Sequence, residues 1–171
     1  VHRIAKAIEN GQKIFWICPL VEESEELNLT SATQRYETLS RQFNAPVGLI
    51  HGRMTGADKD SAMEAFRNGD TRLLVATTVV EVGVDVPDAT IIIIENTERF
   101  GLCQLHQLRG RVGRGDKKSY CILMYDFVGQ VGKRRLNIMR ETNDGFLISE
   151  EDLKIRGAGE VLGTKQSGFP E

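Results

Sequence analysis

The chain has 171 residues, a formal net charge of −2 and a pI near 6.0, which suits one domain with a small appendage and excludes a broadly basic protein. Its three cysteines are odd in number and form no Cys-x-x-Cys pair, so we expect no structural metal, no disulfide framework and a cytoplasmic setting. No apolar run approaches the ~20 residues that span a membrane. The chain begins at Val1 with a pattern typical of a helix already under way, so we expect a fragment of a longer polypeptide.

Short apolar runs alternate with helical patterns as far as residue 126. Strands are expected at 13–18, 47–50, 72–77, 90–95 and 119–125, and helices at 31–43, 55–67 and 102–114. The first of these helices is expected to begin at a Ser31…Gln34 capping box, and the second at Thr55. The strands are apolar throughout, which is typical of strands covered on both faces. This succession predicts an α/β fold with a parallel sheet flanked by helices.

The pattern changes after Asp126. A helix with basic residues in its first half is expected at 131–140, and a turn is expected at 142–145. A Ser149…Asp152 capping box predicts the start of a second helix, which is expected to end at Gly157. The glycine-rich tail that follows shows neither the helical nor the strand periodicity of apolar residues. We therefore predict two parts: a sheet domain at 1–126, and a helical hairpin with an irregular hook at 127–171.

The stretch QLRGRVGR, residues 107–114, concentrates three arginines in eight positions. On a helix, Gln107, Arg111 and Arg114 fall within roughly 60° of one another, away from a leucine stripe. They would project together into a space that a neighbouring domain completes, and guanidinium groups match phosphate oxygens. Arg109 falls near the apolar side, so either its side chain reaches back to water or the helix deviates there. A solvated basic helix with a glycine cap is the alternative.

Two expected strands end in polar turns. Thr77 opens the run TTVVEVGVD at a strand's carboxyl end, where open α/β sheets bind ligands. Gly83 and Asp85 suit a tight turn with a carboxylate for a ribose hydroxyl, although an ordinary connection fits equally well. Gly52 and Arg53 precede a helix, where backbone N–H groups either bind a phosphate or merely form a turn.

The sequence has no Gly-x-x-x-x-Gly-Lys-[Ser/Thr] loop and no acidic metal-binding box, so only half of a nucleotide site is present.

These motifs resemble a known group of proteins. TTVVEVGVDVP followed by QLHQLRGRVGRG is similar to motifs V and VI in the second RecA-like domain of superfamily 2 helicases. ICPLVEES and HGRM resemble the accessory motifs of that domain. ENTERFGLCQLHQLRGRVGRG and EEDLKIRGAGEVLGTKQSG resemble the RecG family of bacterial branched-DNA helicases. The second of these stretches is similar to the translocation motif that RecG shares with transcription-repair coupling factors.

The resemblance implies roles for particular residues. Arg114 would be an arginine finger that reaches the γ-phosphate of ATP, with Arg111 beside it and Gln107 coupling the site to the cleft. Gly83 and Asp85 would contact the nucleotide or the motif VI helix. DNA-binding or translocation roles are implied for Thr77, Gly52, Arg53, Arg135, Arg156 and Gln166.

The expected function is that of a carboxyl-terminal motor domain in an ATP-dependent double-stranded DNA translocase and helicase, which remodels replication forks and Holliday junctions in repair and recombination. ATP and Mg²⁺ would be bound mainly by the first RecA-like domain of the same polypeptide, so this chain alone is expected to hydrolyse no ATP. The expected partners are that domain and branched or double-stranded DNA, in a bacterial cytoplasmic monomer without membrane contact. The alternatives are the motor of a transcription-repair coupling translocase and a non-catalytic nucleic-acid-binding module.

Overall fold

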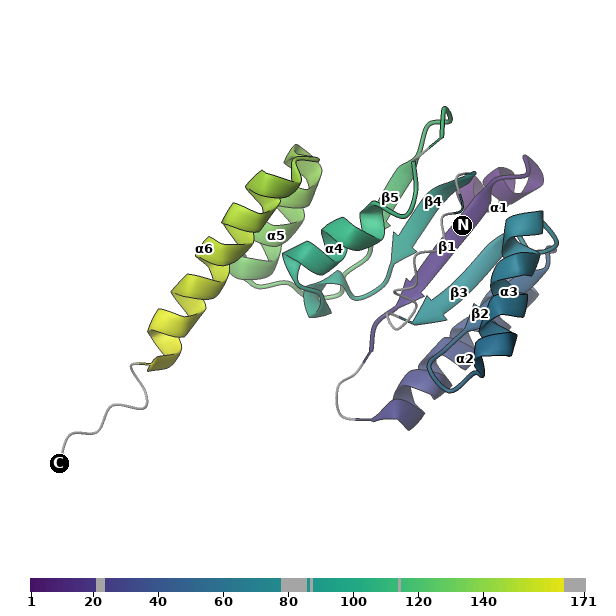
Figure 1. Ribbon diagram of the computed structural model, residues 1–171, viewed down its shortest axis with the longest axis horizontal. Coiled ribbons are helices and arrows are strands. Elements are labelled where there is room, and N and C mark those ends of the chain that lie inside the picture. The colour runs from purple at the N-terminus through teal and green to yellow at the C-terminus, as the bar shows by residue number, and fades with distance from the viewer. Residues whose placement is uncertain (21–23, 78–85, 87, 114, 165–171) are drawn as a thin grey trace.

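A parallel sheet forms the centre of the computed structural model, which describes residues 1–20, 24–77, 86, 88–113 and 115–164, with the backbone alone at 158–164 (Figure 1). Within this part of the chain five strands pair in parallel in the order β2-β3-β1-β4-β5. The strands are β1 (Lys13–Cys18), β2 (Val47–Ile50), β3 (Leu73–Thr77), β4 (Ala89–Ile94) and β5 (Tyr120–Leu123). The predicted α/β class is confirmed.

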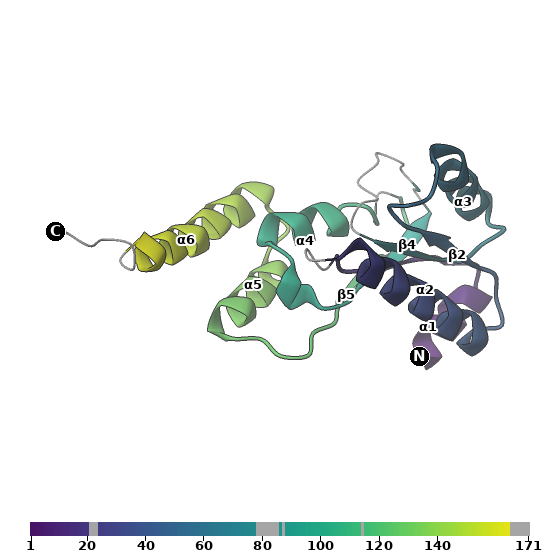
Figure 2. The same cartoon turned by 90° about the horizontal axis from the view of Figure 1, so that it is seen from below.

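Helices cover both faces of this sheet. They are α1 (His2–Glu9), α2 (Glu25–Gln42), α3 (Gly56–Asn68), the 3-10 turn η1 (Thr97–Arg99), α4 (Leu102–Arg109), α5 (Gln130–Glu141) and α6 (Gly145–Thr164). Helices α1 and α2 lie on one face and α3 and α4 on the other, while α5 and α6 pack beside α4 and project away from the sheet (Figures 1 and 2). None of the described helices is both long enough and apolar enough to cross a membrane.

The core is divided by the sheet into two clusters. Phe15 and Ile92 point into the cluster under α3 and α4, whereas their neighbours Ile14 and Ile93 point into the cluster under α1 and α2. Because successive strand residues face opposite ways, a strand buried on both sides is apolar at most of its positions. This requirement accounts for the continuous apolar runs in the sequence.

Helix caps explain where two predicted starts were wrong. Helix α2 begins at Glu25, not at Ser31, because the hydroxyl of Ser24 accepts a hydrogen bond from the Leu27 amide at 3.3 Å. Helix α6 begins at Gly145, not at Ser149, because a carboxylate oxygen of Asp144 accepts from the Phe146 amide at 2.9 Å. The start of α3 is confirmed, since the Thr55 hydroxyl accepts from the Asp58 amide at 3.1 Å.

Two predicted helix ends were wrong as well. Helix α4 stops at Arg109 rather than at Arg114, because Gly110 caps it and Gly113 has a left-handed φ of 81°. Helix α6 continues through Gly157 as far as Thr164. The hook that was predicted beyond it lies outside the described residues.

Candidate nucleotide and DNA interface

Several predicted site residues lie along one edge of the sheet. Since all described strands are parallel, their carboxyl ends meet at that edge, where open α/β sheets bind ligands. Thr77 ends β3 and pairs in register with Cys18 at the end of β1. Gly52 and Arg53 form the turn after β2, on the far side of β3 from Cys18. The structure therefore brings the three predicted DNA-contacting residues of the sheet domain to a common edge.

Thr77 is only 2% exposed, and its hydroxyl has no hydrogen-bond partner among the residues that the structure describes. A buried hydroxyl without a partner costs free energy. In the neighbouring turn, the Arg53 amide donates to Nδ1 of His51 at 3.3 Å, and the Arg53 guanidinium lies 3.8 Å from the Glu25 carboxylate. One of the backbone donors predicted to hold a phosphate is therefore already engaged.

The charge at this turn comes from arginine and lysine rather than from histidine. Burial lowers the pKa of His51, and the nearby charges of Lys59 and Arg53 lower it further. Its ordinary value is 6.5, so the ring is neutral at physiological pH. The cations near this turn are therefore Arg53, which lies close to Glu25, and Lys59 of α3, beside a neutral imidazole.

The predicted grouping of Gln107, Arg111 and Arg114 is only partly described. Gln107 is exposed on α4, on the side away from buried Leu102 and Leu105. Arg111 is half-buried and stands past the end of α4, where its amide donates to the Leu108 carbonyl at 3.0 Å. Gly83, Asp85 and Arg114 lie outside the described residues. Because α4 ends before Arg111, the three residues cannot lie together on one face of that helix.

Arg109, which did not fit either face in the helical pattern, contacts the hairpin. Its Nη1 donates to the carbonyls of Met139 and Thr142 at 2.7 and 3.0 Å, and its Nη2 lies 3.1 Å from Nδ1 of His106. The last carbonyls of a helix lack partners within it, so Arg109 caps α5 from outside. Burial lowers the pKa of Arg109, which is still charged at neutral pH. Sequence periodicity could not reveal this contact, because its acceptors lie 30 and 33 residues away.

The two predicted hairpin arginines that are described occupy different surroundings. Nε of Arg156 lies 3.0 Å from the Asp152 carboxylate, which is buried and also lies 3.4 Å from the Cys103 thiol of α4. Arg135 lies on α5, where its Nε is buried with no hydrogen-bond partner within the described part of the chain. Gln166 falls outside that part. Helix α6 is thus attached to the start of α4, and α5 to its end.

Sequence reasoning missed a cavity of about 470 Å³ between α2 and the β4–α4 connection. Arg35 and Arg99 line it, and Nε of Arg35 lies 2.6 Å from the Glu95 carboxylate. The buried Cys18 thiol lies 3.7 Å from the same carboxylate; burial, with the Glu95 charge, raises its pKa to about 12. The motif stretches that contain Cys18 and Arg99 gave no sign of it, because the cavity forms only where segments 81 residues apart come together.

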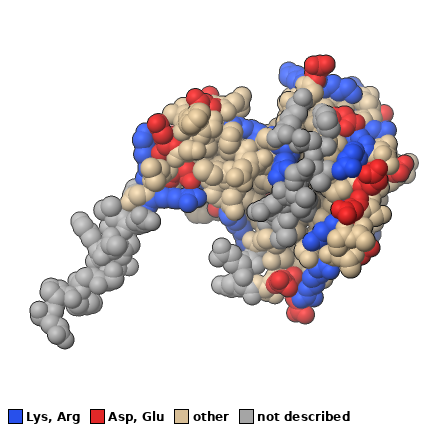
Figure 3. All heavy atoms as spheres, in the orientation of Figure 1, with Lys and Arg blue, Asp and Glu red and all other residues tan. Residues whose placement is uncertain are grey.

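Metal-ligating and charged side chains are scattered over the described residues. Among them, no group of three or more His, Cys, Asp or Glu side chains could hold a metal ion. Figure 3 shows basic and acidic side chains interspersed over the visible face, without a field of one sign. An anion that bound to this face would therefore be held by individual arginines and backbone amides.

Residues 1–116 match the model of the family described as helicase conserved C-terminal domain, and residues 142–170 match that of ATP-dependent DNA helicase RecG, domain 3, C-terminal. The ATP-dependent DNA helicase RecG of Bacillus subtilis is 51% identical over 98% of this chain and 25% of that protein. The RecG of Escherichia coli K12 is 51% identical over 96% of this chain and 24% of that protein. The chain therefore spans about a quarter of the length of these relatives.

Solved structures agree with this similarity. The structure of RecG bound to a three-way DNA junction superposes with a TM-score of 0.78 at 45% identity, over 93% of this chain and 21% of that one. The C-terminal domain of the DEAD-box protein Dbp5 gives a TM-score of 0.54 at 19% identity, over 81% of this chain and 73% of that one. The latter likeness shows the fold alone.

Proposed function

Because the chain belongs to the helicase conserved C-terminal domain family, we propose that it is the carboxyl-terminal motor domain of an ATP-dependent double-stranded DNA translocase and helicase. Its task would be to remodel replication forks and Holliday junctions in DNA repair and recombination. The main support is the similarity to RecG, which runs through the sheet and the α5–α6 hairpin together. The proposed setting is a monomer in the bacterial cytoplasm.

The proposed division of labour assigns residues 1–126 to the motor and 127–171 to the hairpin and hook. Helix α4 stands between them, with Leu102 and Leu105 in the core of the sheet domain. Its Cys103 and Arg109 contact the hairpin. A shift at the end of α4 would therefore move the hairpin through direct contacts.

In the proposed ATP site, Arg114 is the arginine finger, Arg111 lies beside it and Gln107 couples the site to the cleft. Gly83 and Asp85 would contact the nucleotide or the end of α4. ATP and Mg²⁺ are assigned mainly to the first RecA-like domain of the same polypeptide, and ATP supplies the phosphoryl group that is transferred to water. A guanidinium stabilises the charge that develops on that group, by a factor of about 10³–10⁵ in rate. Such a finger acts only when the two domains close on each other.

The proposed DNA contacts lie at two places. Thr77, Gly52 and Arg53 would hold the backbone of the duplex at the carboxyl edge of the sheet. Arg135, Arg156 and Gln166 would link the ATP state to movement along it. Phosphate contacts of this kind give affinity without sequence preference, and they weaken as salt rises.

Strand separation on a three-way junction tests this proposal. The polypeptide that carries this chain is incubated with ATP and Mg²⁺, and a linear duplex of the same sequence and length serves as the control. We expect hydrolysis stimulated by DNA and separation of the junction strands. Hydrolysis that moves the protein along the linear duplex without separating any junction would support a coupling-type translocase instead. DNA binding without hydrolysis would contradict both motors and support a non-catalytic module.

A further inference from the structure

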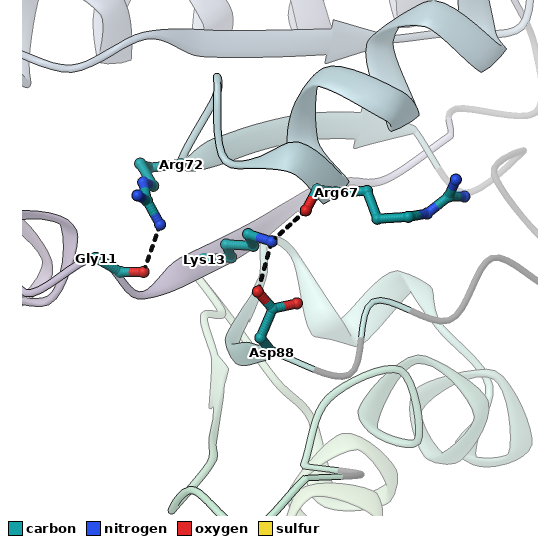
Figure 4. A network of polar contacts seen from close by, with 5 residues as sticks. All are labelled: Gly11, Lys13, Arg67, Arg72 and Asp88. Atoms are coloured by element: carbon teal, nitrogen blue, oxygen red, sulfur yellow. Dashed lines mark hydrogen bonds and ion pairs between the residues drawn. The ribbon is translucent and has the colours of Figure 1, made fainter.

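A buried lysine joins three elements at the amino end of the sheet. Lys13, the first residue of β1, is 3% exposed. Its Nζ donates to the Arg67 carbonyl at the end of α3 and to the Asp88 carboxylate, each at 2.6 Å (Figure 4). A buried ammonium is tolerated only where such acceptors replace water. Lys13 therefore holds Asp88 in place against the sheet.

Asp88 lies next to a contact between the start of β4 and the segment that follows α4. It directly precedes β4, whose first residue, Ala89, pairs in register with Lys13. The Ala89 carbonyl accepts a hydrogen bond from the Gly113 amide at 3.5 Å. In the sequence, Asp85 comes three residues before Asp88, and Arg114 directly follows Gly113. The contacts of Lys13 with Asp88 and of Gly113 with Ala89 form one junction. This junction anchors the segment that follows motif V and the segment that ends motif VI.

The charges at this junction reinforce the same contact. Partial burial works to raise the pKa of Asp88, but the hydrogen bond from Lys13 and the charges of Lys13 and Lys117 outweigh it and lower that pKa. Lys117 follows motif VI in the sequence, so both segments also meet electrostatically at Asp88. The carboxylate is ionised at neutral pH and keeps its attraction for Lys13.

We propose that Lys13 is a positioning residue for ATP hydrolysis, which holds Asp88 so that the segments bearing Asp85 and Arg114 keep a fixed relation to each other. The inference deepens the proposed function and rests on it. Lys13 is buried and lies at the opposite end of the strands from the predicted DNA-contacting residues, so it is not itself a DNA contact. Its loss should therefore slow turnover and leave DNA binding unchanged.

The test compares Lys13→Met with Arg72→Met in the polypeptide that carries this chain. Met keeps most of the length of the lysine side chain and removes its charge. Arg72 is a matched control, since its Nη1 donates at 2.7 Å to the Gly11 carbonyl at the same end of the sheet and not to Asp88 (Figure 4). We expect Lys13→Met to lower kcat for DNA-stimulated hydrolysis about 10- to 100-fold with KM for ATP nearly unchanged, because a displacement of about 1 Å can cost roughly 10²-fold. Arg72→Met should keep kcat within about twofold.

A pair of variants at Asp88 keeps the inference testable where Lys13→Met fails to fold. Asp88→Asn retains an acceptor for Lys13, whereas Asp88→Ser is too short to reach it. Asp88→Asn should therefore turn over ATP faster than Asp88→Ser by about tenfold. Equal turnover in this pair, or kcat losses that merely follow Tm in Lys13→Met and Arg72→Met alike, would overturn the positioning role. A wild-type protein without DNA-stimulated hydrolysis would contradict the proposed function itself, and the inference would lose its premise.

Discussion

At the scale of single residues, cations with little access to water are held by oxygens from distant parts of the chain. Lys13 binds oxygens 54 and 75 residues away, and Arg109 binds carbonyls 30 and 33 residues away. Removing a charge from water is costly unless acceptors replace the lost solvent. We therefore expect these side chains to help specify which segments meet.

The Lys13–Asp88 pair should make folding stability depend on pH. The pKa of Asp88 in the folded protein lies below its ordinary value of 3.8, so the stabilisation is complete above that value and is lost as pH falls through the lower, folded pKa. Urea unfolding of the wild type and Asp88→Asn from pH 7 to pH 3 measures this. The difference in unfolding free energy should shrink on acidification.

A double-mutant cycle supplies the control for this pH effect. In a Lys13→Met background, Asp88→Asn should change the unfolding free energy little at any pH, because the partner charge is gone. A difference that stays constant with pH in the wild-type background, or that persists without Lys13, would show that Asp88 acts through other groups.

At the scale of elements, α4 presents three sides to three surroundings. Leu102 and Leu105 face the core, Cys103 and Arg109 face the hairpin, and Gln107 faces solvent. The helix is only eight residues long, and isolated helices of that length are unstable. Packing on the sheet and on the hairpin therefore determines its position.

Arg109→Ala should loosen the hairpin from α4. Hydrogen bonds from a charged donor contribute about 1.5–3 kcal/mol each, and partial exposure of Arg109 reduces this, so we expect a loss of about 2 kcal/mol in docking. Amide hydrogen exchange should become faster in α5 and at the start of α6 but stay unchanged in β1 and β3. Arg140→Ala, which removes an exposed arginine of α5, is the control. Equal exchange in the two variants would remove Arg109 from this role.

The sequence predicted the strands well because burial on both faces leaves a continuous apolar run, as at residues 14–18 of β1. The start of α3 was also predictable, since Thr55 and Asp58 signal it locally. The start of α2 was not, because Ser24 and Ser31 both precede helix-compatible residues and only the fold selects Ser24. The end of α4 depends on Gly110 and on the contact of Gly113 with Ala89, which a uniform 100° rotation per residue ignores.

The candidate site was predictable where it depends on strand direction alone. Parallel strands bring Thr77 and the turn at Gly52 to one edge whatever the details of packing. The contacts of Arg109 and the cavity beside Arg35 require knowing how helices pack on the sheet. Those arrangements join segments distant in sequence, so no local pattern encodes them.

At the scale of the whole molecule, a sheet domain carries a projecting hairpin (Figure 1), and the chain spans about a quarter of the length of the RecG relatives that it matches. The sequence contains neither a phosphate-binding loop motif nor an acidic metal-binding box. The purified chain alone should therefore hydrolyse ATP no faster than background, with or without DNA. A steady-state rate clearly above background would contradict this division between two domains.

The proposed role of this chain is to supply an arginine finger to a neighbouring motor domain. Its most direct test is the kcat for DNA-stimulated ATP hydrolysis by the polypeptide that carries Arg114→Ala, measured together with ATP affinity. We predict a fall in kcat of about 10³-fold or more, equivalent to roughly 4 kcal/mol of transition-state stabilisation, with ATP binding largely intact. Arg114→Lys should recover little, because an ammonium lacks the planar fork of the guanidinium. Near-normal turnover in Arg114→Ala would contradict the claim.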